Sequence, residues 1–295
     1  MIKGYLYMIF SALFFCLMTV FVKLSGQEIH TIQIVLIRGL ITLFFTYLML
    51  LYYGVYPLGN NKRILMLRGF VGTIALFLVF ESIQRFSLPE ATVIQYLYPI
   101  FTAILAFLLL SEKIGKILFL AIILGIIGVY TILDFPFQNS NSMIIKEDIF
   151  IAISGSFFTG LAYVLVRKSS NLNESPYVIM FYFPLFTVPI SLLFMPEYWI
   201  QPSLNTWLYL LLVGIFSQLG QFCLTFGYKL LPATRAAITS YLQVPFSVLA
   251  GIIIFHDNIS YNFIIGSIIV FSTMILVIQN GSSEGQYNDS GKNII

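Results

Sequence analysis

Long apolar stretches separated by short polar breaks recur along the whole chain. Each stretch is about 18 residues or longer, enough for an α-helix to cross the ~30 Å hydrocarbon layer of a membrane. The fold class is therefore predicted to be all-α, a polytopic membrane protein with ten transmembrane helices. The predicted spans are 4–24, 31–53, 64–86, 88–110, 115–134, 149–167, 176–195, 205–228, 232–254 and 261–279.

Composition supports a membrane protein and excludes several other classes. Hydrophobic residues make up 59% of the 295 residues and charged residues 9%, against about 25% charged in a soluble domain. The net charge of +3 is small and dispersed, which argues against a nucleic-acid partner. The sequence contains no P-loop, dinucleotide fingerprint, HExxH or GxSxG motif. We therefore expect no enzyme activity, no cofactor and no metal site.

The two halves of the chain resemble each other. Residues 88–101 read LPEATVIQYLYPIF and residues 231–246 read LPATRAAITSYLQVPF, each with a Leu-Pro start, a Tyr-Leu pair and a later proline. SALFFCLMTVFVK at 11–23 parallels SGSFFTGLAYVLVRK at 154–168 at nearly the same offset. A repeat of five spans is odd, so the second copy enters the membrane from the opposite side. Such an inverted repeat is typical of transporters that work by alternating access.

This duplication predicts the domain organisation. We expect a first five-helix repeat at 1–134, a polar outside loop at 135–148, a second repeat at 149–279 and a disordered tail at 280–295. One set of span ends carries most of the Lys and Arg residues. The positive-inside rule then predicts that both termini are cytoplasmic, in a bacterial-type plasma (inner) membrane. The opposite ends carry only Lys23, Arg38, Arg85 and Lys146.

Particular residues in these repeats resemble the drug/metabolite transporter superfamily, EamA type. They are Pro99 and Ser111-Glu112 in the first half, Thr234-Arg235-Ala236-Ala237, Pro245 and Asp257 in the second, and Arg38 and the RGF at 68–70. His256-Asp257 departs from the family, whose repeats commonly have Gly-Glu there. The resemblance covers residues 1–280. It implies a central cavity lined mainly by the first, third, fourth, sixth, eighth and ninth helices, with the fifth and tenth peripheral, and it implies no particular substrate.

Charged side chains are unusually dense in VFESIQRFSLPE at 79–90. Glu81 and Arg85 are four residues apart, on one helix face, so they can pair. Two interpretations of Glu81 stay open: an ion pair that anchors the helix end, or a cavity-facing carboxylate that binds a proton or a cationic group. Glu90 is explained by a capping box that begins at Ser87. Arg38 is taken, with Arg85, as a charge partner or gate, or else as a snorkelling residue.

Neutral polar side chains recur at spacings of three or four in five spans, which puts each set on one helix face. An amide facing lipid would be unsatisfied, so these faces should point into the bundle. They line a substrate cavity, or they hydrogen-bond neighbouring helices as in any bundle. Two prolines are expected to act as hinges, Pro99 and Pro245. The predicted cavity-lining residues are Glu81, Gln84, Thr92, Gln95, Tyr96, Thr159, Tyr163, Gln218, Gln221, Ser240, Tyr241 and Gln243.

These features together predict a transporter of a small organic metabolite, with an amino acid or related amphipathic solute favoured. Alternating access would be secondary active or an exchange, since no ATPase motif is present. The expected partners are the substrate and the lipid bilayer; proton or counter-solute coupling and a homodimer are left open. The competing class is a non-transporting membrane sensor or scaffold, which would give no substrate-dependent flux.

Overall fold

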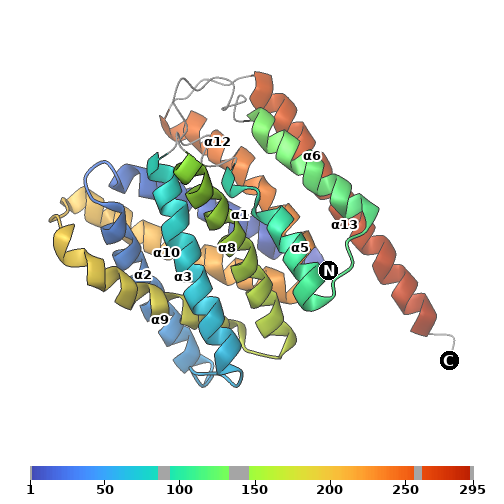
Figure 1. Ribbon diagram of the computed structural model, residues 1–295, viewed down its shortest axis with the longest axis horizontal. Helices are drawn as coiled ribbons and strands as arrows, with labels where there is room; N and C mark the ends of the chain where they lie inside the picture. Colours follow the sequence, from blue (N-terminus) through green and yellow to red (C-terminus); the bar gives the residue numbers. More distant parts are fainter. Residues whose placement is uncertain (1, 86–93, 133–145, 256–260, 293–295) are drawn as a thin grey trace.

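The computed structural model describes residues 2–85, 94–132, 146–255 and 261–292. Every regular element in these ranges is a helix, and the helical segments follow the ten predicted spans in order (Figure 1). The predicted fold class is confirmed. Glu90, Thr92 and Asp257 lie outside the described residues, so their predicted roles stay predictions.

The first half contributes five helical segments to the bundle. Three are long and apolar enough to cross a membrane unaided, and the last two are shorter. The first half consists of α1 (Ile2–Ser25), α2 (Thr31–Tyr52), α3 (Lys62–Arg85), α5 (Tyr98–Leu110) and α6 (Lys116–Ile132).

The second half follows the same order with one helix in two pieces. Its segments are α8 (Lys146–Asn171), α9 (Pro176–Phe194) with the 3-10 turn η1 (Met195–Glu197), α10 (Leu204–Leu230), α11 (Ala233–Thr239), the 3-10 turn η2 (Ser240–Leu242), α12 (Gln243–Phe255) and α13 (Tyr261–Lys292). The last helix continues past 279, and Figure 1 shows its end projecting beyond the bundle. The Gly/Ser/Asn-rich composition of 280–295 predicts a disordered tail, and this assignment stays a prediction.

The fourth and ninth spans are both interrupted at a Tyr-Leu pair. In the fourth, a turn at 96–97 precedes α5; in the ninth, η2 separates α11 from α12. A proline follows each break, Pro99 in α5 and Pro245 in α12. Proline lacks a backbone N–H and its ring crowds the preceding turn, so a regular α-helix gives way there. Both copies of the repeat therefore break at the same place.

Helices α6 and α13 lie side by side along one edge of the molecule (Figure 1). Their backbones meet at Gly128 and Gly266, where a Cβ on Gly266 would lie 2.6 Å from the carbonyl oxygen of Gly128. Small residues let helices approach closely when no hydrophobic effect drives them together in lipid. The fifth and tenth spans are thus peripheral, as the family resemblance implied.

Two carboxylates join the halves at opposite ends of the bundle. Glu28, between α1 and α2, accepts hydrogen bonds from the Ser203 backbone N–H (2.7 Å) and hydroxyl (2.9 Å) and from the Thr206 hydroxyl, at the start of α10. Glu174, between α8 and α9, accepts from the backbone N–H groups of Asn60 (2.9 Å) and Asn61 (2.5 Å), at the start of α3. Each carboxylate satisfies unpaired donors at a helix N-terminus. The contact is repeated because the halves are inverted copies.

The close approach of α6 and α13 at Gly128 and Gly266 predicts that one added methyl group lowers the stability of the protein. Gly266→Ala should destabilise the protein by about 1–3 kcal/mol, because the new Cβ would overlap backbone atoms of α6 and force the helices apart. The midpoint of thermal unfolding in detergent measures this. Gly115→Ala is the matched control, since a Cβ there would meet nothing within 4 Å. Equal midpoints for the two variants would contradict the crossing.

The Glu28 contact predicts a pH-dependent stability. Hydrogen bonds from Thr206 and Ser203 lower the pKa of Glu28, so its contribution is present above the ordinary carboxyl pKa of about 4.3. It is lost as the pH falls through the lowered pKa, because the folded carboxylate must then take up a proton. Near neutral pH, Glu28→Gln should unfold at a lower temperature than the wild type, and the gap should close in acid. A constant gap would disprove the effect; Glu197→Gln, an exposed carboxylate, is the control.

Candidate substrate site

Five tyrosine rings gather where the two broken spans meet α8 and α10. The ring centre of Tyr96 lies 6.0 Å from that of Tyr98 and 5.9 Å from that of Tyr241. Tyr163 of α8 lies 5.3 Å from Tyr98 and 5.2 Å from Tyr228 of α10. The buried hydroxyl groups of Tyr228 and Tyr241 have no hydrogen-bond partner within the described part of the chain. These five rings are called the tyrosine cluster below.

Polar contacts hold the broken fourth span beside this cluster. Gln95 Nε2 donates to Thr159 Oγ1 of α8 (3.3 Å). The Ser156 hydroxyl donates to the carbonyl oxygen of Ile94 (2.5 Å), which belongs to the helical turn before the break. In the ninth span, Ser240 donates to the Ala237 carbonyl and is hydrogen-bonded to the Tyr98 hydroxyl. The structure therefore brings together Gln95, Tyr96, Thr159, Tyr163, Ser240 and Tyr241 of the predicted set.

Two of the buried arginines lie against one aromatic ring. Arg38 of α2 and Arg68 of α3 are 7% and 2% exposed, and their guanidinium carbons lie 5.7 Å and 5.1 Å from the ring centre of Phe183 in α9. Arg38 Nε donates to the Ser217 hydroxyl (2.7 Å), whereas Nε and Nη1 of Arg68 have no acceptor. Within the described ranges neither arginine has a carboxylate partner. Tyr163 lies on α8, which packs along α3, the helix that carries Arg68.

Arg68 is the residue that sequence reasoning missed. The sequence places it among the positive charges at the cytoplasmic span ends and in the family-like RGF at 68–70, but gives it no place in the cavity, whereas its side chain is buried among helices. Gly72, one helical turn later, makes this possible: a Cβ there would lie 2.4 Å from Arg68 Nη1. The signal available in the sequence was the glycine four residues after an arginine, on the same helix face.

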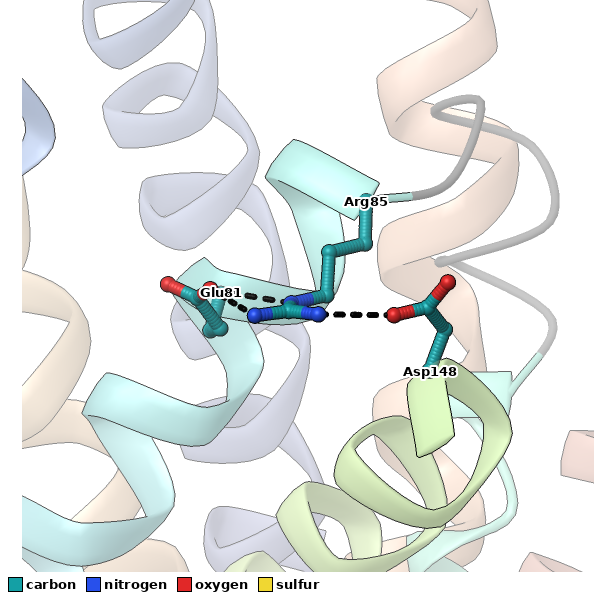
Figure 2. Close-up of polar contacts among 3 residues, drawn as sticks. All are labelled: Glu81, Arg85 and Asp148. Atoms are coloured by element: carbon teal, nitrogen blue, oxygen red, sulfur yellow. Dashed lines mark hydrogen bonds and ion pairs between the residues drawn. The ribbon is translucent and has the colours of Figure 1, made fainter. Parts of the chain in front are cut away.

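Glu81 lies in an ion-pair network with Arg85 of its own helix and Asp148 of α8 (Figure 2). Arg85 Nε donates to Glu81 Oε1 (2.9 Å), and Arg85 Nη1 donates to Asp148 Oδ1 of α8 (2.8 Å). The Glu81 and Arg85 side chains are 45% and 39% exposed. This geometry favours the anchoring interpretation of Glu81, and a role in substrate or proton binding stays an untested prediction.

The remaining predicted residues are more scattered. Gln218 Nε2 donates to Thr46 Oγ1 of α2 (3.0 Å), which is the interhelical hydrogen bond expected of any bundle. Gln221 Nε2 donates to Thr225 Oγ1 one turn along its own helix (3.4 Å). Gln243 is partly buried in the first turn of α12. The Gln84 side chain, like Thr92, lies outside the described residues.

Comparison with known proteins agrees with this architecture. The model of the EamA-like transporter family matches residues 2–134 and 147–279, one match in each half. The chain therefore belongs to the EamA-like transporter family: it is a multi-pass membrane transporter and not an enzyme. A crystal structure of another protein superposes with a TM-score of 0.79 over 92% of this chain and 95% of that chain. At 15% identity that likeness shows the fold alone.

Several curated proteins are similar to this chain over most of its length. An "uncharacterized transporter" of Helicobacter pylori is 31% identical over 81% of this chain and 82% of its own. The pseudopaline exporter CntI of Pseudomonas aeruginosa is 25% identical over 83% and 85% of the two chains. An S-adenosylmethionine uptake transporter of Rickettsia conorii is 26% identical over 87% and 85%.

The ion-pair network predicts a small effect for Glu81. Glu81→Gln should cost less than about 1 kcal/mol of stability, because the pair is half exposed and Arg85 keeps Asp148 as a partner. Substrate flux into proteoliposomes should keep the wild-type dependence on external pH. Loss of that dependence in Glu81→Gln would instead assign Glu81 to proton coupling. Arg85→Gln is the companion variant, since it removes the partner and keeps the carboxylate.

Proposed function

We propose that the protein moves a small amphipathic organic solute, an amino acid or a related metabolite, through a site at the tyrosine cluster. The observation that carries this proposal is that both interrupted spans bring their Tyr-Leu breaks to one place, beside Tyr163 and Tyr228. Discontinuous helices that meet at the interface of two repeats are where transporters of this architecture bind substrate. The site is buried among helices and carries unsatisfied phenol hydroxyl groups.

The chemistry of the cluster suits an amphipathic solute. A phenol ring offers an apolar face and a hydroxyl group that donates and accepts hydrogen bonds. Buried hydroxyl groups without partners are costly, and a solute that hydrogen-bonds Tyr228 and Tyr241 would remove that cost. Ring stacking and hydrogen bonding together select a molecule with an apolar body and polar groups.

Alternating access is supported by a further polar contact between the halves, centred on Glu112. Arg167 of α8 donates through Nη1 to the carbonyl oxygens of Tyr228 (3.2 Å) and Lys229 (2.7 Å). Its Nε lies 3.6 Å from Glu112 Oε1, in the link after α5, and Glu112 accepts from the Ala233 backbone N–H (3.1 Å). The Arg167 bonds to Tyr228 and Lys229 lie within the second half; the two contacts of Glu112, with Arg167 and with Ala233, join the first half to the second at the end that the positive-inside rule assigns to the cytoplasm. We propose that they break when the site opens to that side.

The charge pattern of the span ends supports a proposal for the membrane, and no direction of transport is assigned. The distribution of Lys and Arg supports a bacterial-type inner membrane with both termini cytoplasmic. The similar proteins are named for export of pseudopaline and for uptake of S-adenosylmethionine, so their names give opposite directions and we assign none. A proton gradient or a counter-solute would drive uphill movement.

Flux through the purified protein tests the proposal. Proteoliposomes should take up at least one member of a radiolabelled amino-acid panel faster than empty liposomes do. Tyr228→Phe and Tyr241→Phe should raise the KM for that solute roughly 5- to 100-fold, as expected when one buried hydrogen bond is removed. Tyr261→Phe, which alters a tyrosine that is 87% exposed, is the control. Equal uptake rates in protein-containing and protein-free liposomes for the whole panel would favour the sensor or scaffold class.

A further inference from the structure

Arg38 of α2 and Arg68 of α3 are both buried in the bundle and lie against the same ring, Phe183 of α9. We infer that Arg38 and Arg68 form an anion-binding part of the substrate site and take a carboxylate group of the solute. This inference rests on the proposed function and narrows it to amphipathic carboxylates. The tyrosine cluster includes neither arginine, so the cluster does not account for the burial of these two charges.

Burial makes these two charges expensive. A guanidinium group among transmembrane helices is normally paired with an acid or faces water, and no carboxylate pairs with Arg38 or Arg68 among the residues the structure describes. Arg38 keeps one hydrogen bond, to Ser217. Both cations lie near the single ring of Phe183, and a cation–π contact compensates only part of the lost hydration. The bundle therefore contains an excess of positive charge that an anion would neutralise.

The geometry indicates where that anion would bind. Arg38 and Arg68 approach Phe183 from two different helices, so both guanidinium groups lie within about 6 Å of one ring centre. Nε and Nη1 of Arg68 are donors without acceptors. A carboxylate accepts several such hydrogen bonds, and bonds between two charged groups are the stronger kind.

Tyr163 connects the arginines to the tyrosine cluster. Its ring packs against Tyr98 and Tyr228, and it lies on α8, which packs along α3, the helix that carries Arg68; the neighbouring Ala162 shares a buried cluster with Val71 of α3. A solute with its carboxylate at the arginines would thus have its apolar body on the tyrosine rings. The chemical class is an amphipathic carboxylic acid, amino acids included.

A structural role is the alternative. The cation–π contacts could simply fasten α2 and α3 to α9, as Thr73 and Thr187 do through their hydroxyl groups (3.0 Å). That role predicts loss of stability in arginine variants without any dependence on a carboxylate. The two roles therefore differ in ligand response and not in stability alone.

Thermal unfolding of the purified protein with matched probes separates the roles. The probes are L-phenylalanine, 3-phenylpropionate and benzoate, each paired with its amide. At least one acid should raise the unfolding midpoint of the wild-type protein, and its amide should not. Arg38→Gln and Arg68→Gln should weaken the apparent affinity for that acid at least about tenfold, the loss expected when one charge-assisted hydrogen bond is removed. Arg63→Gln, which removes an exposed charge in the first turn of α3, should bind as the wild type does.

Three results would overturn the inference: no acid shifts the midpoint, the amides shift it equally, or both Gln variants bind the acid normally. Should the Gln variants fail to fold, Arg68→Lys keeps the charge but offers a compact ammonium group in place of the planar guanidinium. It should bind the acid more weakly than the wild type, and unchanged binding would count against the inference.

Flux measurements keep this inference separate from the proposed function. Suppose that an amide probe is taken up equally by the wild type and Arg68→Gln, and that no acid binds more tightly than its amide. Transport at the tyrosine cluster would then stand, and the anion site would be rejected. If instead an acid binds in an arginine-dependent way but no solute is transported, the anion site would stand and the proposed transport would be rejected.

Discussion

Inside a hydrocarbon layer each backbone amide and each charge must find its partner within the protein. This constraint explains why the two interrupted spans lie in the interior of the bundle, where side chains such as Ser156 reach the carbonyl of Ile94. It explains why carboxylates accept hydrogen bonds at the N-termini of long helices, Glu28 at the start of α10 and Glu174 at the start of α3. It also draws attention to the donors of Arg68 and the hydroxyl groups of Tyr228 and Tyr241, which have no hydrogen-bond partner among the residues that the structure describes. A ligand is the natural partner for groups that the fold leaves unsatisfied at its centre.

The scaffold is nearly symmetric, and the site is not. Both halves repeat the break before a proline and the carboxylate contact at a helix N-terminus. Arg38 and Phe183 hold matching places, each the eighth residue of its helix, and they meet in the bundle. One copy supplies a cation and the other an aromatic ring. Inversion places equivalent positions opposite each other. Different side chains at these positions therefore give the proposed site a cationic side and an aromatic side.

Much of the candidate site was visible in the sequence as polar positions at helical spacing. Gln95, Thr159, Ser240 and the tyrosines do meet, because their spacing puts them on inward faces of the spans around the breaks. Spacing alone did not separate these residues from Gln218, which hydrogen-bonds Thr46 on a neighbouring helix. Both kinds of residue face inward, and only the packing of helices distant in the sequence decides which partner each one meets.

The sequence by itself determined the membrane class, the ten helical segments and the inverted repeat. These follow from apolar length and from odd-numbered duplication, which are local or internal properties of the chain. The tertiary structure decided the roles of the charges. Glu81, the most conspicuous acid in the sequence, lies at a half-exposed helix end with Arg85 and Asp148. Arg68, which the sequence places near a span end and in the family-like RGF at 68–70, lies buried beside Phe183. The physical reason is that an arginine side chain spans more than a helical turn, so the position of its charge depends on the space that Gly72 and the neighbouring helices leave open.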